Sequence, residues 1–99
     1  MVTLRDDYKS TYIAAAATTA ITGTVPTTCK LIRITVGETA AGAIKVYDAV
    51  SGGATDAQEK AELKSSIVEG TYEYGITMAK GIQVVSFAGS KFTVVWSNV

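Results

Sequence analysis

Short runs in which apolar and polar residues alternate recur along most of the chain, roughly ten residues apart. The clearest run is KLIRITV at residues 30–36, where Ile32, Ile34 and Val36 fall on one face of an extended chain. Alternation with a period of two is typical of a half-buried β-strand. The run AIKVYDA at residues 43–49 follows after a loop bounded by glycines. We therefore expect these two runs to form a β-hairpin with a loop of medium length.

A second pair of alternating runs lies between residues 69 and 87, in the stretch EGTYEYGITMAKGIQVVSF. Its first half places four large side chains on one face, namely Tyr72, Tyr74, Ile76 and Met78. Gly81 is suited to a positive φ, so residues 78–81 predict a tight turn that joins the two halves into a hairpin. The return run is apolar on both faces, which is typical of an inner strand.

The segment DAQEKAELKSSIVEG at residues 56–70 fits two patterns. Thr55 followed three residues later by Gln58 matches a helix capping box, and the residues after it favour helix. However, Leu63, Ser65 and Ile67 also alternate. We expect one short helical turn, followed by a strand from about residue 62.

The N-terminal stretch TYIAAAATTAITGTVPTT, residues 11–28, is rich in alanine and threonine. It fits either the first strand pair of the domain or an extended arm that lies across a neighbouring subunit. A chain of 99 residues forms one domain. We therefore describe residues 1–99 as a single β domain, with residues 29–99 as its core and residues 1–28 as the arm or first strand pair.

The fold class follows from the number of strands and from composition. The final run, KFTVVWS at residues 91–97, predicts a closing strand with Phe92, Val94 and Trp96 inward. Valine, isoleucine and threonine, which favour strands, make up 33 of the 99 residues. Seven or eight short strands predict an all-β antiparallel sandwich or jelly roll with little helix.

The composition limits the classes of molecule that we expect this protein to bind. The chain is 47% hydrophobic and only 18% charged, against about a quarter charged in a typical soluble domain. We expect copies of the same chain or another protein to cover part of this surface. The nine basic and nine acidic residues cancel, and no basic stripe is visible. Nucleic acid is therefore not an expected partner.

The N-terminal residues, the lengths of the apolar runs and the single cysteine predict the compartment in which the protein is made. The start, MVTLRDDYKS, carries charges at residues 5–7, where a signal peptide needs apolar residues. No apolar run approaches 18 residues, so no membrane association is expected. The single cysteine, Cys29, is expected to be a buried apolar side chain. These features predict a soluble protein made in a reducing cytoplasm.

Catalytic residues are scarce. The chain has no histidine, and one cysteine cannot build a cysteine-rich metal site. Glu69 and Glu73 share a face of one predicted strand about 13 Å apart, too far for a glycosidase pair within that strand. We therefore predict no catalytic residues, no metal and no cofactor.

Four aromatic residues leave one functional alternative open: Tyr47, Tyr72, Tyr74 and Trp96. They can fill the core or a subunit interface, where tyrosine and tryptophan are common. They can also form a sugar-stacking face. The second possibility keeps a glycan-binding adhesion module among the candidate functions.

The order of the segments KLIRITVGETAAGAIKVYDAVSGG and GTYEYGITMAKGIQVVSFAGSKFTVVW resembles small β proteins of tailed-phage virions. The resemblance covers residues 30–97 and implies a non-enzymatic capsid decoration or cement protein that binds the major capsid protein. Another small head or tail component is the alternative. The resemblance also implies a homo-oligomer, most often a trimer, located in the virion.

The expected contact elements are the N-terminal arm, Thr11 to Thr24, and exposed strand edges. The residues that we expect at the interface are Tyr12, Ile13, Ala15, Ile21, Tyr47, Val85 and Phe87.

Overall fold

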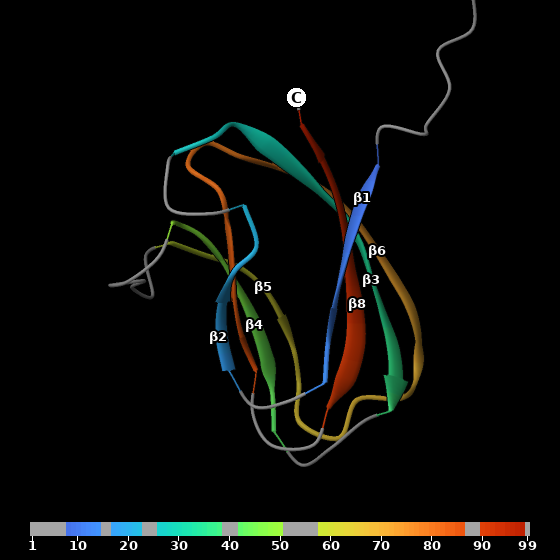
Figure 1. Cartoon of the computed structure of the whole chain (residues 1–99). Coiled ribbons are helices and arrows are strands. Elements are labelled where there is room, and N and C mark those ends of the chain that lie inside the picture. Colours follow the sequence, from blue (N-terminus) through green and yellow to red (C-terminus); the bar gives the residue numbers. More distant parts are fainter. Residues whose placement is uncertain are drawn as a thin grey trace, which may run out of the picture.

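The computed structural model describes residues 8–14, 17–22, 26–38, 42–50, 58–86 and 90–98. Within these ranges the chain forms eight β-strands arranged in two sheets, as Figure 1 shows. The strands are β1 (Lys9–Ile13), β2 (Ala17–Ala20), β3 (Cys29–Glu38), β4 (Ile44–Asp48), β5 (Glu59–Leu63), β6 (Gly70–Met78), β7 (Ile82–Ser86) and β8 (Lys91–Asn98). The prediction of an all-β antiparallel sandwich is confirmed.

The two sheets arise from one long antiparallel ribbon that is folded over. The first four strands pair with the last four in reverse order: β1 with β8, β2 with β7, β3 with β6 and β4 with β5. Two further pairings, β3 with β8 and β4 with β7, join these arms side by side. Sheet A then has the order β1-β8-β3-β6 and sheet B the order β2-β7-β4-β5. This is a jelly roll, in which each arm of the ribbon contributes to both sheets.

The hydrophobic core lies between the two sheets. Its members alternate along the strands, because successive side chains of a strand point to opposite faces, except at the register shift of β3 between Leu31 and Arg33. They are Ile13, Cys29, Leu31, Ile34, Val36, Ile44, Val46, Leu63, Met78, Ile82, Val84, Phe92 and Val94. β7 is buried along most of its length, in agreement with its predicted inner position.

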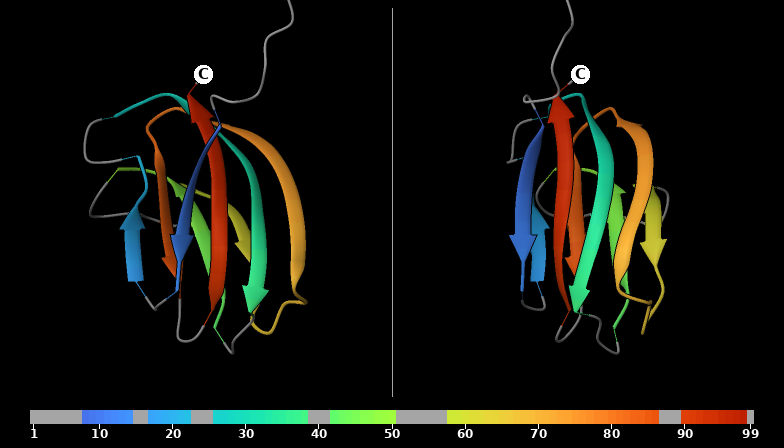
Figure 2. Two further views of the ribbon diagram at one scale, coloured as in Figure 1. Left: turned by 45° about the vertical axis from the view of Figure 1, so that its right-hand side comes forward. Right: turned by 90° about the vertical axis from the view of Figure 1, so that its right-hand side faces the viewer.

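The predicted hairpins are wrong. β3 and β4 lie in different sheets, and so do β6 and β7. Residues 79–81, between β6 and β7, form a corner that leads from one sheet to the other rather than a hairpin turn, and Figure 2 shows the two sheets from two sides. Alternation tells which side chains share a face, but each strand could pair with any other strand of the same character. The nearest neighbour in sequence is therefore not the partner in space.

The expectation for residues 56–70 is also corrected. Strand β5 already occupies Glu59–Leu63, where the helical turn was expected to continue, and pairs with β4. The alternation beyond Leu63 is not a strand, because the chain turns at Ser65 and Ser66, the latter with φ of 58°. Thr55, the first residue of the expected capping box, lies outside the described residues.

The N-terminal segment belongs to the sandwich where the structure describes it. β1 pairs with β8 in sheet A, and β2 pairs with β7 in sheet B. Ile13 of β1 is a member of the core. Residues 9–13 and 17–20 are thus strands of the two sheets and not a free arm.

Asp48, the last residue of β4, fixes the corner between β6 and β7. Its carboxylate accepts hydrogen bonds from the backbone N–H groups of Ala79 at 3.0 Å, Lys80 at 2.7 Å and Gly81 at 3.3 Å. The Thr22 hydroxyl accepts a further bond from Ile82 N–H at 3.1 Å. The corner is therefore held from both β4 and the end of β2.

We predict that Asp48→Asn lowers the free energy of unfolding by about 1 kcal/mol at pH 7, because bonds to a charged acceptor are lost at a partly solvated site. Burial acts to raise the pKa of Asp48, but the N–H donors of Lys80, Ala79 and Gly81, with the Lys60 charge, outweigh it and lower that pKa. The stabilisation is therefore fully present above the ordinary value of 3.8 and is lost as the pH falls through the folded-state pKa. Urea unfolding should show the two proteins converging in acid; a constant difference would contradict this role.

We predict that Gly81→Ala destabilises the fold more than Gly70→Ala. Both glycines have positive φ, 152° and 154°, which strains any other residue by about 1–3 kcal/mol. A Cβ at Gly81 would also lie 2.5 Å from Thr22 Oγ1 and 3.2 Å from the Ala49 carbonyl oxygen, whereas a Cβ at Gly70 meets nothing within 4 Å. Thermal unfolding of both variants provides the comparison, and equal losses would contradict the close packing at this corner.

Candidate interaction surface

The outer face of sheet A carries a row of hydroxyl side chains that crosses all four strands. Tyr12 of β1 lies opposite Thr93 of β8, Thr93 lies opposite Thr35 of β3, and Thr35 lies opposite Thr71 of β6. The neighbours of these residues along each strand, such as Ile13, Phe92 and Ile34, are buried in the core. The row must therefore point away from the core, because side chains alternate along a strand. We call this surface, with the adjacent row described next, the outer face.

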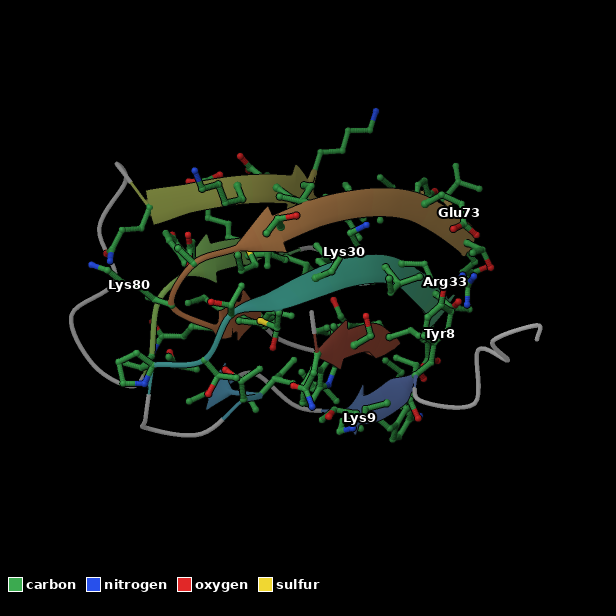
Figure 3. All side chains as sticks on the ribbon, turned by 90° about the horizontal axis from the view of Figure 1, so that it is seen from above. Tyr8, Lys9, Lys30, Arg33, Glu73 and Lys80 are labelled. Atoms are coloured by element: carbon green, nitrogen blue, oxygen red, sulfur yellow. The ribbon has the colours of Figure 1, made fainter. Side chains whose placement is uncertain are left out.

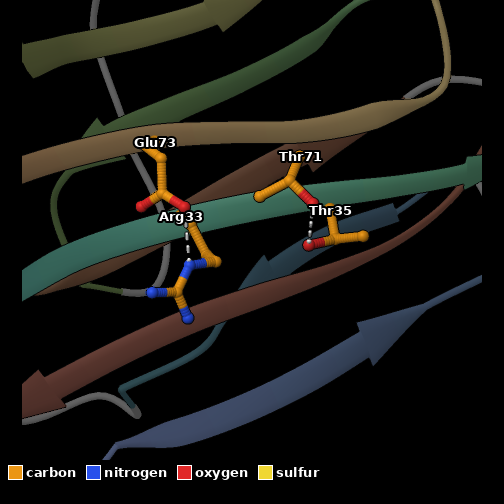
Figure 4. Close-up of polar contacts among 4 residues, drawn as sticks. All are labelled: Arg33, Thr35, Thr71 and Glu73. Carbon is orange, nitrogen blue, oxygen red and sulfur yellow. Dashed lines mark hydrogen bonds and ion pairs between the residues drawn. The ribbon is translucent and has the colours of Figure 1, made fainter.

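The adjacent row is formed by Ser10, Val95, Arg33 and Glu73, which lie opposite one another in the same four strands. Arg33 Nε donates a hydrogen bond to Glu73 Oε2 at 3.0 Å, and one row further the hydroxyls of Thr35 and Thr71 lie 3.3 Å apart (Figure 4). Both contacts join β3 to β6. They bring polar side chains of the two neighbouring strands into contact above the sheet.

Tyr8 covers one end of the outer face. Its ring lies 5.9 Å from the Arg33 guanidinium carbon, a distance that permits a cation–π interaction. Figure 3 shows Tyr8, Arg33 and Glu73 gathered at the same end of the sheet. Tyr12 is 63% exposed, one of two large apolar side chains that are strongly exposed among the described residues; the other is Val68. The face thus combines two tyrosines, a neutralised ion pair and short hydroxyl side chains.

This arrangement is suited to contact with a broad, flat surface. Threonine is stiff at χ1, so ordering its side chain on binding costs little entropy. Arg33 and Glu73 neutralise each other, and tyrosine and arginine are the residue types that most often dominate binding energy. The outer face therefore combines stiff hydroxyl side chains with an ion pair that carries no net charge.

The four aromatic residues of the proposed sugar-stacking face do not form an exposed platform. Tyr47 is only 8% exposed, and the other three pack against the core: Tyr72, Tyr74 and Trp96. The Tyr72 hydroxyl donates to the Val68 carbonyl oxygen. Burial, with a smaller contribution from Tyr72, raises the pKa of Tyr74. These four side chains serve packing, as the core alternative expected.

The residues expected at an interface fall into several groups. Tyr12 is exposed on the outer face, whereas Ile13 and Tyr47 are buried and cannot make surface contacts. Ile13 lies opposite Phe92 in the β1–β8 pair and faces the core with it, which is the physical reason for this correction. Tyr47 lies opposite Gln83, which is also buried. Ile21 and Val85 are half-buried, and Ala15 and Phe87 lie outside the described residues.

Of the eight residues in the two rows of the outer face, only Tyr12 was expected at the interface. The polar residues on β3, β6 and β8 that were not expected there are Arg33, Thr35, Thr71, Glu73 and Thr93. The sequence does indicate that these residues lie on the surface, because they are the polar members of alternating runs. What the sequence did not indicate is that β8, β3 and β6 lie side by side, so that separate polar positions form one surface.

Reactive groups in the described part of the chain do not converge. Cys29 is buried in the core, and burial, together with the Asp48 charge, raises the pKa of its thiol. The thiol is therefore held in its less reactive, protonated form. Within the described ranges, no group of three or more potential metal ligands lies together. The same ranges contain no helix of the length and apolar character needed to cross a membrane.

Comparison with known proteins gives no neighbour: no family model, no curated protein and no solved structure matches the chain.

We predict that Arg33→Ala and Glu73→Ala each change the free energy of unfolding by less than about 1 kcal/mol. The side chains are 34% and 64% exposed, and solvent-exposed ion pairs contribute little to stability. A double-mutant cycle by urea denaturation measures the coupling directly. A coupling of several kcal/mol would mean that this pair supports the fold rather than a binding surface.

Proposed function

We propose that this chain is a non-enzymatic structural protein of a tailed-bacteriophage virion, a capsid decoration or cement protein that binds the major capsid protein through the outer face of sheet A. The observation that carries the proposal is the continuous row of Tyr12, Thr93, Thr35 and Thr71 across four strands. The row spans the whole width of sheet A, so it suits a broad protein partner.

Composition supports the same proposal. The low charged fraction of 18% leaves a surface that is less polar than that of a typical soluble domain. A shell protein presents the same surface in many copies, so contacts of modest affinity hold many decorating molecules at once. The segment order that resembles small virion proteins agrees with this role. Another small head or tail component would use the same kind of contact.

The proposal is tested by cosedimentation with empty shells assembled from the major capsid protein encoded in the same genome. We predict saturable binding of the wild-type chain, and binding that is at least about tenfold weaker for Tyr12→Ala/Arg33→Ala, because two anchor side chains are lost. Val68→Ala is the matched control: Val68 is 75% exposed but lies outside the outer face.

Two results would contradict the proposal in different ways. If the wild-type chain does not sediment with the shells at any concentration, the role as a decoration protein is wrong. If it binds and the double variant binds equally well, the partner is right but the outer face is not the contact surface.

A further inference from the structure

The sandwich has four strand edges, and they lie on two opposite sides. β1 and β2 end their sheets on one side, and β6 and β5 end them on the other. Figure 2 shows the two early strands together at one side of the molecule. Each of the four pairs with one other strand only within the described residues, so each offers a free row of backbone N–H and C=O groups. Such rows pair with other chains unless the protein prevents it.

The side formed by β5 and β6 is protected. On β6, Tyr74 and Gly75 occupy a place that a single residue, Ile32, fills on β3, and Gly75 has φ of 118°. This is a β-bulge, which bends an edge strand away from regular pairing. The β4–β5 register also shifts, between Val46 and Tyr47. Three of the five residues of β5 are charged, namely Glu59, Lys60 and Glu62. Bulges and charges are the usual means of blocking edge-to-edge association.

The side formed by β1 and β2 has fewer of these protections, since the charge within its two strands is limited to Lys9 at the start of β1. The registers of β1 with β8 and of β2 with β7 run without a shift. Strand β2 has the sequence ATTA, with no charge, proline or glycine. Ile21 N–H donates a hydrogen bond to the Ile82 carbonyl oxygen at 2.9 Å, so the backbone N–H and C=O groups of Ile21 face β7. The direction of the backbone N–H and C=O groups alternates along the strand. Those of Thr19 therefore face β7, whereas those of Thr18 and Ala20 point outward.

We propose that a second copy of this chain adds to the free edge of β2 in antiparallel orientation, around a two-fold axis at Thr19. Thr18 then lies opposite Ala20 of the second copy, and Ala20 opposite Thr18. The outward groups of these residues form four backbone hydrogen bonds between the copies. Sheet B becomes one continuous eight-stranded sheet, twice its four strands in the single chain.

Symmetry favours a dimer with a two-fold axis over a trimer. A trimer built by strand addition is head-to-tail, so the β2 edge would have to pair with a different edge of the next copy. The edges on the other side, β5 and β6, are bulged or charged. A two-fold axis needs only the less protected side, because each copy contributes the same edge. This geometry replaces the trimer that the family resemblance implies.

The contact area favours a second copy over an isolated peptide. A peptide can add to one strand edge only. In the two-fold dimer, β1 of one copy also lies alongside β1 of the second copy. The four residues of β2 and the five of β1, strands up to about 17 Å long on two sheets about 10 Å apart, give a total buried area on the order of 1,000 Å². That is the lower end for a specific interface, so we expect a dissociation constant on the order of 10–100 μM. The contact does not depend on the proposed capsid partner.

The test is sedimentation equilibrium of the full chain over concentrations up to about 0.5 mM, well above the expected dissociation constant. We expect a reversible change from the 10.3 kDa monomer to a species of twice that mass. A trimer, or a monomer over the whole range, would overturn the proposal. Thr18→Pro removes one outward N–H and should weaken dimerisation at least tenfold.

Two charged variants provide an independent test in case the proline substitution disturbs the folding of β2. In Thr18→Lys/Ala20→Lys and in Thr18→Glu/Ala20→Glu, like charges lie opposite each other across the two-fold axis, so each variant alone should be monomeric. An equimolar mixture should recover the dimer, because each lysine then faces a glutamate. Thr77→Lys on β6, an exposed position outside the outer face, is the matched control and should dimerise like the wild type. Dimerisation of either charged variant alone, or failure of the mixture to dimerise, would overturn this register.

Discussion

The structure depends on one constraint: each of the first four strands pairs with one of the last four, in reverse order, and the ribbon that they form is folded over. The first strand pairs with the eighth, the second with the seventh, the third with the sixth and the fourth with the fifth. A ribbon with one apolar face buries it only by folding that face onto itself. The fold brings β3 beside β8 and β4 beside β7, and the core forms between the two sheets. The Asp48 carboxylate holds the corner where β6 leaves one sheet and β7 enters the other.

The outer face is a product of that same folding. Thr93, Thr35 and Thr71 are far apart in sequence, and they form a row only because β8, β3 and β6 become neighbours. The contact of Arg33 with Glu73 joins residues 40 positions apart. The two free sides also follow from the ribbon. Its beginning provides β1 and β2 on one side, and the strands after its turn provide β5 and β6 on the other. Assembly and docking would therefore use different surfaces of one small domain.

The fold class could be predicted from the sequence because alternation is a local property. Alternation with their neighbours places Ile34, Val36, Phe92 and Val94 on the inner face, and all four are buried as expected. Ile32, expected on that face too, is not in the core, because the register shift between Leu31 and Arg33 brings Leu31 inward instead. Pairing could not be predicted, since it depends on contacts between distant segments. The strand after Thr55 begins at Glu59, earlier than the expected position near residue 62, because pairing with β4 overrides the helix preference of Glu59 and Ala61. Tyr12 was expected at an interface and is exposed, whereas Ile13, also expected there, faces the core.

On the proposed function, the outer face of sheet A, rather than a reactive site, makes the contact with the capsid. The most direct measurement is a cryo-electron microscopy map of capsid shells, assembled from the major capsid protein of the same genome, after saturation with this protein. The account predicts density for the jelly roll with the outer face of sheet A against the shell and Tyr12 within the contact. A map in which the domain meets the shell through sheet B or through the β5–β6 side would contradict it, as would shells that carry no added density.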